Sequence, residues 1–363
     1  MLGLGNTLVN NKFGNIFTGI LNKISVPTAA AYSLRLLNKD YTGSAIRVRR
    51  SSDNAETDIG FTAGGDLDET ALLNHTAYDI GRVWDGGVLV ASGARVYGIT
   101  QLSNGDVLTV GLDTHRVYRS TDNGVTWDGG VLISGAGLVD ITQLSNGDVL
   151  AVGAATNRVY RSSGTGYVTT LYDQSGNGRN ATQTIAGSQP SIMKFGVLNE
   201  DVNSNVFLDF DTKFMTGAVG LGTAQSIVAV YSKSVNGVNT HIFGSGKSGG
   251  DTGINIFEDT NNKTNVTRDA SMFSDPVDSS LTKKIIVGEN TNNPPQYYKN
   301  GVQNIVTSAL PTSVEANLIS IGTSGFPMQA RFYGGMIFTN TLSTSDRQTL
   351  ERNQGNFYGI TVA

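Results

Sequence analysis

The sequence predicts an all-β chain: a β-sandwich with an inserted pair of β repeats and a short N-terminal helix. Three observations carry this prediction. Of the 363 residues, 45 are glycine, which is well above the usual share of ~7%, and only 15% of all residues are charged, against the usual ~25%. This composition is typical of short strands joined by tight turns. Residues 167–183 join a β-branched strand to a glycine-rich turn. Residues 83–162 contain one pattern twice, about 42 residues apart.

The chain begins with an apolar stripe spaced like one face of a helix. Its members recur three or four residues apart: Phe13, Ile16, Phe17, Ile20, Leu21 and Ile24. A helix of about 12 residues is not stable alone in water, so the stripe must pack on its own domain, on sister chains or on a larger particle. We expect residues 1–26 to be an attachment and oligomerisation segment, with packing on the chain's own sandwich as the alternative. Too few lysines flank the stripe for a membrane-surface helix.

Three elements are predicted after Pro27, which ends that first helix. Strong helix formers fill residues 29–37 and predict a short helix. Alternating apolar and basic residues over 45–50 predict a strand with one wet face. Residues 66–74 predict a second helix, with Asp66 as its N-cap.

Residues 79–164 break this pattern with an internal repeat, which predicts an insertion into one loop of the sandwich. Each copy contains WDGGVL, then ITQLSNGDVL, then RVYRS. Tyr118 and Tyr160 lie 42 residues apart, a period that fits one four-stranded propeller blade. The Asn-Gly pair within each copy predicts a two-residue hairpin turn.

Residues 120–127, STDNGVTW, resemble the Asp-box of sialidase-type BNR repeats. In that family the box is a structural hairpin on the propeller rim, away from the active site. The resemblance implies that Trp127 fills the blade core and that Asp122 ties down the turn. Gly124 and Trp84 belong to the same structural motif.

Two blades do not close a propeller, which needs roughly four to eight. The apolar runs of each copy therefore need facing neighbours. A closed ring of identical chains would supply them, and three chains with two blades each would give six. We expect a homotrimer that shares one propeller; the alternative is that the two blades pack face to face on the sandwich as a small two-sheet module.

The sandwich is organised around YVTTLYDQSGNGRNATQ at 167–183. Asp173 opens a turn in which Gly176 and Gly178 are free to take positive φ. Together with TGSAIRVRRSSDN at 42–54, this stretch resembles the first part of the catalytic domain of the α-L-arabinofuranosidase B family. It is also similar to the front half of phage and bacterial surface proteins with a concanavalin-A-like (laminin-G-like) domain. The resemblance implies a concanavalin-A-like β-sandwich, a jelly roll, over residues 27–78 and 165–363.

The second half of the chain returns to strands. Strands are predicted at 226–233, 283–289, 296–302, 317–322 and 331–339. YKNGV predicts a tight hairpin with Asn300 and Gly301 at its turn. A capped helix is predicted from residue 342 onward.

A glycosidase needs two carboxyl groups, about 5–5.5 Å apart in a retaining enzyme. The nearest candidates are Glu258 and Asp259, at the end of a predicted strand, and a solvated strand end is the favoured explanation for both. The arabinofuranosidase family has disulfides, whereas this chain has no cysteine, so that part of the family's pattern is missing.

Sugar binding would fall to tyrosines in surface loops, since amphipathic rings stack on sugar faces. The candidates are Tyr297, Tyr298 and Tyr333, with cross-strand packing as the alternative.

Several partner classes are disfavoured. The net charge of −4 without a basic block argues against nucleic acid. The three histidines are scattered, so no metal site is expected; calcium in an Asp- and Asn-rich loop is left open, though no D-x-D-x-D run supports it. The G-x-G-x-x-G spacing at 244–249 is not followed by a helix, so no nucleotide or other cofactor is expected. No apolar run reaches the ~18 residues of a membrane span.

These observations together favour a non-enzymatic virion surface protein, a fibre, spike or decoration subunit. Zero cysteines and the lack of a signal peptide lead us to expect that it is made in a host cytoplasm. It would attach to other virion proteins through residues 1–26, and its expected task is adhesion to a cell-surface glycan. The first alternative is a glycan-degrading hydrolase of α-L-arabinofuranosidase type, and the second is a purely structural particle component.

Overall fold

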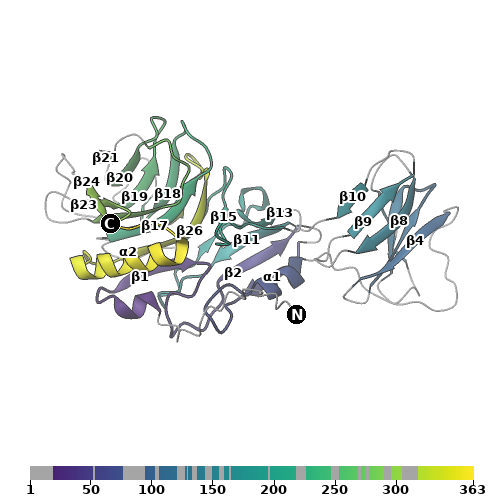
Figure 1. Cartoon of the computed structure of the whole chain (residues 1–363), viewed down its shortest axis with the longest axis horizontal. Helices are drawn as coiled ribbons and strands as arrows, with labels where there is room; N and C mark the ends of the chain where they lie inside the picture. Colours follow the sequence, from purple (N-terminus) through teal and green to yellow (C-terminus); the bar gives the residue numbers. More distant parts are fainter. Residues whose placement is uncertain are drawn as a thin grey trace, which may run out of the picture.

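The structure is a computed structural model of the whole chain. It describes residues 19–363 apart from 52–53, 77–94, 103–105, 121–126, 129, 133–136, 144–148, 155–158, 163–164, 195–196, 218–225, 247–252, 269–270, 275–277, 290–295 and 305–317. The described chain is mostly β, with large antiparallel sheets and the two α-helices α1 (Glu69–Thr76) and α2 (Thr344–Tyr358) (Figure 1). Short 3-10 helices are η1 (Ile20–Lys23) and η2 (Ala186–Ser188).

One layer of the sandwich, sheet I, is a ladder of six antiparallel strands. In spatial order they are β1 (Thr28–Ser33), β26 (Ala330–Phe338), β17 (Ser226–Lys233), β22 (Lys284–Glu289), β23 (Gln296–Lys299) and β24 (Val302–Asn304). The first strand of the chain thus pairs with the last. Asn300 and Gly301 take positive φ between β23 and β24, so the predicted hairpin is confirmed.

The facing layer, sheet II, is also antiparallel. In spatial order its strands are β3 (Glu56–Ile59), β2 (Ile46–Arg50), β11 (Gly166–Leu171), β12 (Ala181–Thr182), β16 (Met215–Gly217), β25 (Ile319–Ile321), β18 (Thr240–Gly244), β19 (Ile254–Glu258), β20 (Thr264–Arg268) and β21 (Ser271–Ser274). Two short strands, β13 (Ser191–Lys194) and β15 (Leu208–Asp209), link β11 of sheet II to β26 of sheet I, and β14 (Val197–Leu198) pairs with β13.

The alternation of side chains along β17 shows how the layers are stacked. Ile227 and Ala229 point into the main core between the two sheets. Val228 and Val230 point the other way, into a second core. That second core is covered by α2 and η1, which lie on the outer face of sheet I (Figure 1). The result is three layers: sheet II, sheet I and a helix.

Helix α2 is fixed at both ends by its sequence. The Ser343 hydroxyl accepts a hydrogen bond from the backbone N–H of Asp346, at 3.0 Å. Gly359 ends the helix with a left-handed φ of 68°. Between these caps, Leu350 and Tyr358 pack on sheet I.

Along the chain the repeat segment lies between α1 and β11, and it forms two small sheets of its own (Figure 1). The first repeat contains β4 (Val96–Gln101), β5 (Val107–Gly111), β6 (Arg116–Ser120) and β7 (Val131–Leu132). The second contains β8 (Leu138–Gln143), β9 (Val149–Gly153) and β10 (Val159–Ser162). Strand β8 lies against β4 and β5, so the two sheets pack on each other around a small apolar core. The predicted limits of the insertion, residues 79 and 164, lie outside the described residues.

Two helix predictions need correction. The alanine-rich stretch 29–37 is not a helix, because its first part is strand β1, held between β26 and the 173–179 turn. Tertiary pairing here overrides helix propensity. The second helix is present but begins later, at Glu69, and the carboxylate that accepts a bond from its first turn is Asp68, not Asp66. The jelly-roll strand order remains a prediction.

Candidate active site

The turn at residues 173–179 joins the two layers of the sandwich. The buried Asp173 carboxylate accepts hydrogen bonds from the backbone N–H groups of Ala31 at 2.9 Å, Ser175 at 2.9 Å and Arg179 at 3.0 Å. Gly176 and Gly178 supply the positive φ that the turn requires. Asp173 is therefore committed to the turn.

Gln174 ties the same turn to the segment after β1. Its side chain is fully buried and makes three backbone hydrogen bonds, accepting from Leu37 and donating to Ser33 and Arg35. This bonding holds the chain from residue 33 to 37 against the turn and places Arg35 at the wall of a pocket.

That pocket is a cavity of about 570 Å³, which we call the acidic pocket. Four segments of the chain form it: the end of β1, the loop into α1, the 199–206 hairpin and the last turn of α2. Its chemistry is set by three carboxylates, one guanidinium and two aromatic rings: Asp66, Glu69, Glu200, Arg35, Phe357 and Tyr358. A pocket of this size and polarity suits a small polar ligand.

Local pairing positions the carboxylates. An antiparallel bridge joins Arg35 to Asp66, and a second joins Glu200 to Val206 across its hairpin. Glu69 lies in the first turn of α1, where the helix dipole favours a negative charge. The acids of the pocket thus sit on paired or helical backbone rather than on free loop.

Arg35 is the buried cation of the acidic pocket. Its guanidinium lies 4.2 Å from the centre of the Phe357 ring and donates to Asn353 Oδ1 at 2.6 Å. Burial lowers the pKa of Arg35, while Tyr358 and the Asp66 carboxylate act in the opposite direction. Its Nε–H has no hydrogen-bond partner among the described residues. A buried guanidinium with spare donor capacity is suited to an oxygen-rich ligand.

Sequence reasoning missed this pocket. Asp66 was predicted only as a helix N-cap, and Arg35, Glu69 and Glu200 were not predicted as site residues. Their separation along the chain leaves no motif, and only the pairing of distant segments brings them together.

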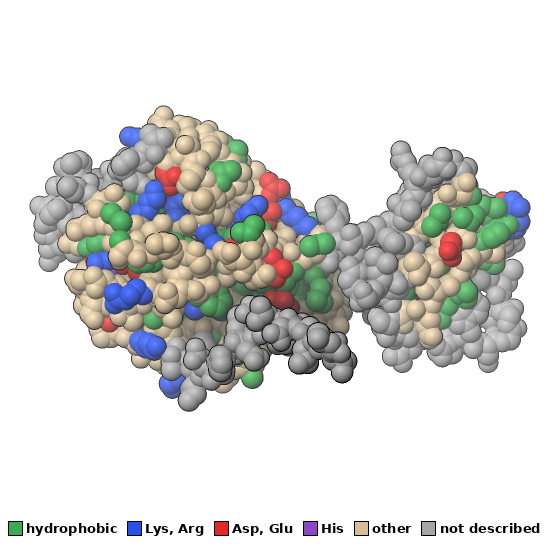
Figure 2. All heavy atoms as spheres, in the orientation of Figure 1, with side chains coloured by type: hydrophobic (Ala, Val, Ile, Leu, Met, Phe, Trp, Pro, Cys, Tyr) green, Lys and Arg blue, Asp and Glu red, His purple; other side chains and the backbone are tan. Residues whose placement is uncertain are grey.

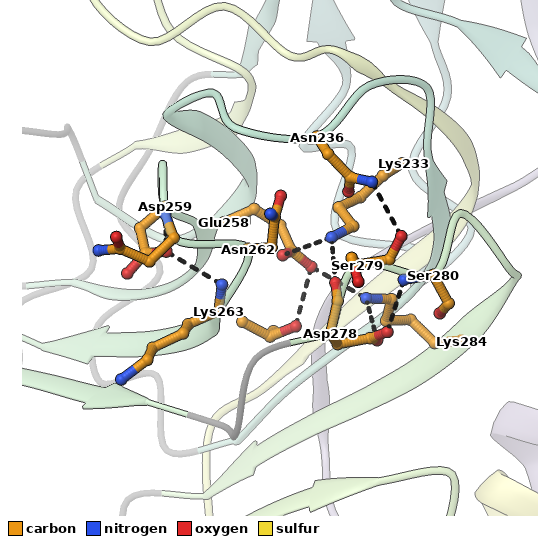
Figure 3. A network of polar contacts seen from close by, with 12 residues as sticks. Lys233, Asn236, Glu258, Asp259, Asn262, Lys263, Asp278, Ser279, Ser280 and Lys284 are labelled. Carbon is orange, nitrogen blue, oxygen red and sulfur yellow. Dashed lines mark hydrogen bonds and ion pairs between the residues drawn. The ribbon is translucent and has the colours of Figure 1, made fainter.

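The predicted catalytic candidate Glu258 belongs instead to a closed cluster, the buried ionic network of Lys233, Glu258, Asp278 and Lys284 (Figure 3). Glu258 is 1% exposed and accepts from Tyr231 at 2.5 Å, Thr264 at 2.8 Å and Lys284 at 3.2 Å. Lys284 also donates to Asp278 at 2.9 Å.

Charge balance explains this network. Burial alone would raise the pKa of Asp278, but hydrogen bonds from Lys299, Ser280 and Lys284 lower it. Burial lowers the pKa of Lys233, against the attraction of Glu258. Because Glu258 is enclosed and paired with lysine, it lacks the access to a substrate that a general acid needs.

Asp259, the second catalytic candidate, closes a turn. Its carboxylate accepts from the backbone N–H groups of Asn261 at 2.8 Å and Lys263 at 3.0 Å. This is the local bonding that aspartate favours at turns, so the adjacent pair Glu258 and Asp259 does not form a catalytic dyad.

The predicted sugar-binding tyrosines are in the wrong place for that task. Tyr297, Tyr298 and Tyr333 are 2%, 6% and 2% exposed. Tyr297 points into the main core, and the other two lie in the core under α2. Cross-strand packing, the alternative, describes them.

The structure separates the residues of the predicted attachment stripe. Phe13, Ile16 and Phe17 lie outside the described residues. Ile20 is buried in the core under α2, and Leu21 and Ile24 pack against that core. The described half of the stripe therefore contacts the chain's own sandwich. Of the blade motif, Trp127 is half-buried, while Trp84, Asp122 and Gly124 lie outside the described residues.

A second set of buried acids lies between α2 and sheet I. Arg347 donates to Glu351 at 2.6 Å, and its guanidinium lies 3.6 Å from the centre of the Tyr298 ring. Burial raises the pKa of Glu289 to about 7, with Arg347 lowering it and Glu351 raising it. This site is closed by the helix.

Across the part of the chain that the structure describes, no group of three or more His, Asp or Glu side chains is arranged to hold a metal ion. Among the same residues, no helix has the length and apolar character needed to span a membrane.

Comparison with known proteins bears on the fold. No family model matches the chain, and no curated protein matches it. Among solved structures, a GH54 α-L-arabinofuranosidase soaked with a cyclic sulfate inhibitor is similar with a TM-score of 0.53 at 15% identity, over 92% of this chain. An arabinofuranosidase complexed with arabinofuranosyl-α-1,2-xylobiose is similar with a TM-score of 0.52 at 16% identity, over the same share. The chain spans 63% of the length of both.

A sialidase from Trypanosoma rangeli in complex with the inhibitor DANA is also found, over 70% of this chain and 52% of that one, at 11% identity. Its TM-score of 0.37 is too low to support an argument. The likeness to the arabinofuranosidases, at this identity, shows the fold.

These findings overturn the main functional expectation. The sequence favoured a non-catalytic virion surface protein, but the arabinofuranosidases that are similar in fold are glycoside hydrolases. The resemblance to arabinofuranosidases is confirmed at the level of the fold, whereas nothing supports the phage origin. The physical reason for the error is that the acids adjacent in the sequence, Glu258 and Asp259, are buried or bound in a turn, whereas the acids that line a pocket come from distant segments of the chain.

Proposed function

We propose that this chain is a glycoside hydrolase that releases a terminal sugar from a glycan, with the acidic pocket as its site. The observation that carries this proposal is the pocket itself: about 570 Å³, with three carboxylates beside a buried arginine. Glycoside hydrolysis uses two carboxyl groups, one on either side of the bond, and three carboxyl side chains line this pocket.

We assign different roles to the acids. Asp66 lies beside Arg35, to which it is joined by a backbone bridge, and lines the same pocket, so we assign to it the stabilisation of, or attack on, the developing positive charge of the sugar. Glu200 lies exposed on its hairpin at another wall of the pocket, so we assign to it the transfer of a proton to the oxygen of the leaving group, with water completing the hydrolysis. Glu69 and Arg35 bind sugar hydroxyls, with Phe357 as an apolar face.

The substrate class follows from the neighbours in fold. One of them was solved with arabinofuranosyl-α-1,2-xylobiose and another with 4-nitrophenyl α-L-arabinofuranoside. An α-L-arabinofuranoside is therefore the first substrate to test. The pocket volume fits one or two sugar units rather than a long chain.

The test is hydrolysis of a panel of nitrophenyl glycosides, with reducing-sugar release from arabinose-bearing xylo-oligosaccharides. We expect Asp66→Asn and Glu200→Gln each to lower kcat/KM by about 10²–10⁴-fold. Glu56→Gln, a change at an exposed acid of β3, is the matched control and should leave kcat/KM unchanged.

Two results would contradict the proposal. One is no release from any glycoside by the folded wild-type chain. The other is a folded Glu258→Gln variant that loses activity while Asp66→Asn and Glu200→Gln retain it, which would move the site to the buried ionic network.

A further inference from the structure

The hairpin at residues 199–206 forms one wall of the acidic pocket and carries Glu200. An antiparallel bridge joins Glu200 to Val206, and the backbone N–H of Phe207 donates to the Asn199 carbonyl at 3.0 Å. The position of the Glu200 carboxyl group in the pocket therefore depends on how firmly this hairpin is held.

The Asp201 carboxylate organises the turn of the hairpin. Its Oδ1 atom accepts hydrogen bonds from the backbone N–H groups of Asn203 at 2.8 Å and Asn205 at 3.1 Å. Ser204, between them, has a left-handed φ of 55°, a conformation that serine rarely keeps unless neighbouring bonds enforce it. One carboxylate thus fixes the turn that follows Glu200.

Lys283 supplies the opposite charge for Asp201. Its Nζ atom donates to Asp201 Oδ2, and the side chains of Lys283 and Asp201 are 10% and 8% exposed. Burial acts to raise the pKa of Asp201, but hydrogen bonds from Lys283 and from the N–H groups of Asn205 and Asn203 lower it below its usual value. Loss of the ammonium group would therefore leave a largely buried carboxylate without its partner charge.

Lys283 also contacts a second wall of the pocket. Its Nζ atom lies 5.0 Å from the centre of the Tyr333 ring and 5.7 Å from the centre of the Tyr358 ring. Tyr358, at the end of α2, lines the pocket, and the Arg35 guanidinium lies 5.5 Å from the centre of the same ring. Lys283 thus connects the hairpin that carries Glu200 to the helix that contacts Arg35.

We propose that Lys283 and Asp201 are positioning residues, which hold Glu200 in the place from which it transfers its proton. This inference rests on the proposed function of the acidic pocket. Neither Lys283 nor Asp201 belongs to the described residues that line the pocket, so both act through the hairpin. A displacement of about 1 Å can lower a catalytic rate by about 10²-fold, so loss of the pair should change kcat more than KM.

The first test is hydrogen exchange in the full-length chain, which needs no substrate. Lys283→Met should make the amides of residues 199–206 exchange about 10–100-fold faster, and Lys283→Arg, which keeps the charge, should restore most of the protection. Lysine and arginine side chains lie scattered over the visible face of the sandwich (Figure 2), which offers a control at an ordinary ion pair. Lys194→Met, which removes a 2.7 Å pair with Asp209 at 38% and 21% side-chain exposure, should change exchange in the hairpin by less than about twofold.

The second test is the hydrolysis of a nitrophenyl glycoside. Lys283→Met and Asp201→Asn should each lower kcat by about 10–100-fold, with KM within about threefold of wild type, and Lys283→Arg should recover most of the loss. An asparagine at position 201 can still accept the N–H bonds of the turn, so this variant serves if Lys283→Met does not fold. Circular dichroism checks the folding of each variant.

The outcomes separate this inference from the proposed function. Unchanged exchange in the hairpin of Lys283→Met and Asp201→Asn would overturn the inference, whatever the activity. So would faster exchange with an unchanged kcat, because Glu200 would then not depend on the pair. Faster exchange confined to residues 199–206, in a chain whose wild type hydrolyses no glycoside, would support the anchoring of the hairpin and contradict the proposed function instead.

Discussion

The sandwich holds two groups of charged residues, and the difference between them is access to water. In the buried ionic network, Glu258, Lys233 and Lys284 are each at most 3% exposed, and every charge faces an opposite charge. In the acidic pocket, three carboxylates and one guanidinium line a cavity. A low-dielectric interior enforces the first arrangement, since an unpaired buried ion costs several kcal/mol. Of these two sites, the acidic pocket leaves its carboxylates accessible to a ligand. The adjacent acids Glu258 and Asp259, which the sequence offers as candidates, are therefore less suitable as a catalytic pair.

The largest effect is expected from a substitution in the buried ionic network. Lys284→Met removes the cation between Glu258 and Asp278 and leaves buried carboxylates without it. We expect a loss of about 3–5 kcal/mol in the free energy of unfolding, measured in urea. Lys39→Met, which removes an exposed pair with Asp40, should cost less than about 1 kcal/mol. Similar losses in the two variants would mean that the network is not desolvated.

The second prediction concerns Glu289, a buried acid between α2 and sheet I. Burial raises the pKa of Glu289 to about 7. Between the usual pKa and that value the folded state binds the proton more tightly than the unfolded chain, so stability falls as pH rises through this window and levels off above it. Glu289→Gln should therefore be more stable than wild type at pH 8, by up to about 3 kcal/mol, and equal to it at pH 4.

The measurement is urea unfolding at a series of pH values, with Glu56→Gln as the control at an exposed acid. A parallel pair of stability curves for Glu289→Gln and wild type would show that Glu289 titrates normally.

The third prediction concerns Gln174, a neutral side chain that is fully buried. Gln174→Ala leaves the N–H of Leu37 and the carbonyls of Ser33 and Arg35 without their partner. We expect a cost of about 2 kcal/mol in unfolding free energy. Because the same bonds hold the wall of the acidic pocket, KM for a glycoside should also rise. Gln303→Ala, at an exposed glutamine of β24, should change neither quantity.

The smallest expected effect on stability lies on the open side. Glu200→Gln changes an exposed carboxylate, so unfolding free energy should stay within about 0.5 kcal/mol of wild type. The large change expected in kcat/KM would then be separated from folding. A stability loss as large as that of Lys284→Met would instead show that Glu200 is part of the scaffold.

The sequence predicted the parts of the fold that depend on local chemistry. The Asn300-Gly301 hairpin and the turn opened by Asp173 follow from residues that tolerate positive φ. Strand 226–233 was predicted with the bounds it has as β17. The helix predicted at 29–37 was wrong because its N-terminal part pairs as strand β1 with β26, which lies near the other end of the chain.

The candidate site was less accessible to prediction. Tyr298 and Tyr333 alternate with core residues, which suggests one wet face, and nothing local to them shows that α2 covers that face. Glu258 ends its strand as predicted, but the lysines that enclose it come from β17 and β22. Burial and charge pairing of this kind are properties of the folded chain and leave no pattern in a short window of sequence.

The contact between Thr76 and Gly166 has a mechanical consequence. A Cβ on Gly166 would lie 2.9 Å from the Thr76 methyl group, so the points where the chain leaves and rejoins the sandwich touch. The ladder of β2 with β11 begins at the same place, where Gly166 pairs with Arg50. A pulling force applied between the two ends of the chain would first have to open that ladder before any tension reached the repeats. The repeat module therefore carries no tension until the sandwich has opened. Force spectroscopy on the full chain should show the sandwich unfolding before the repeats extend.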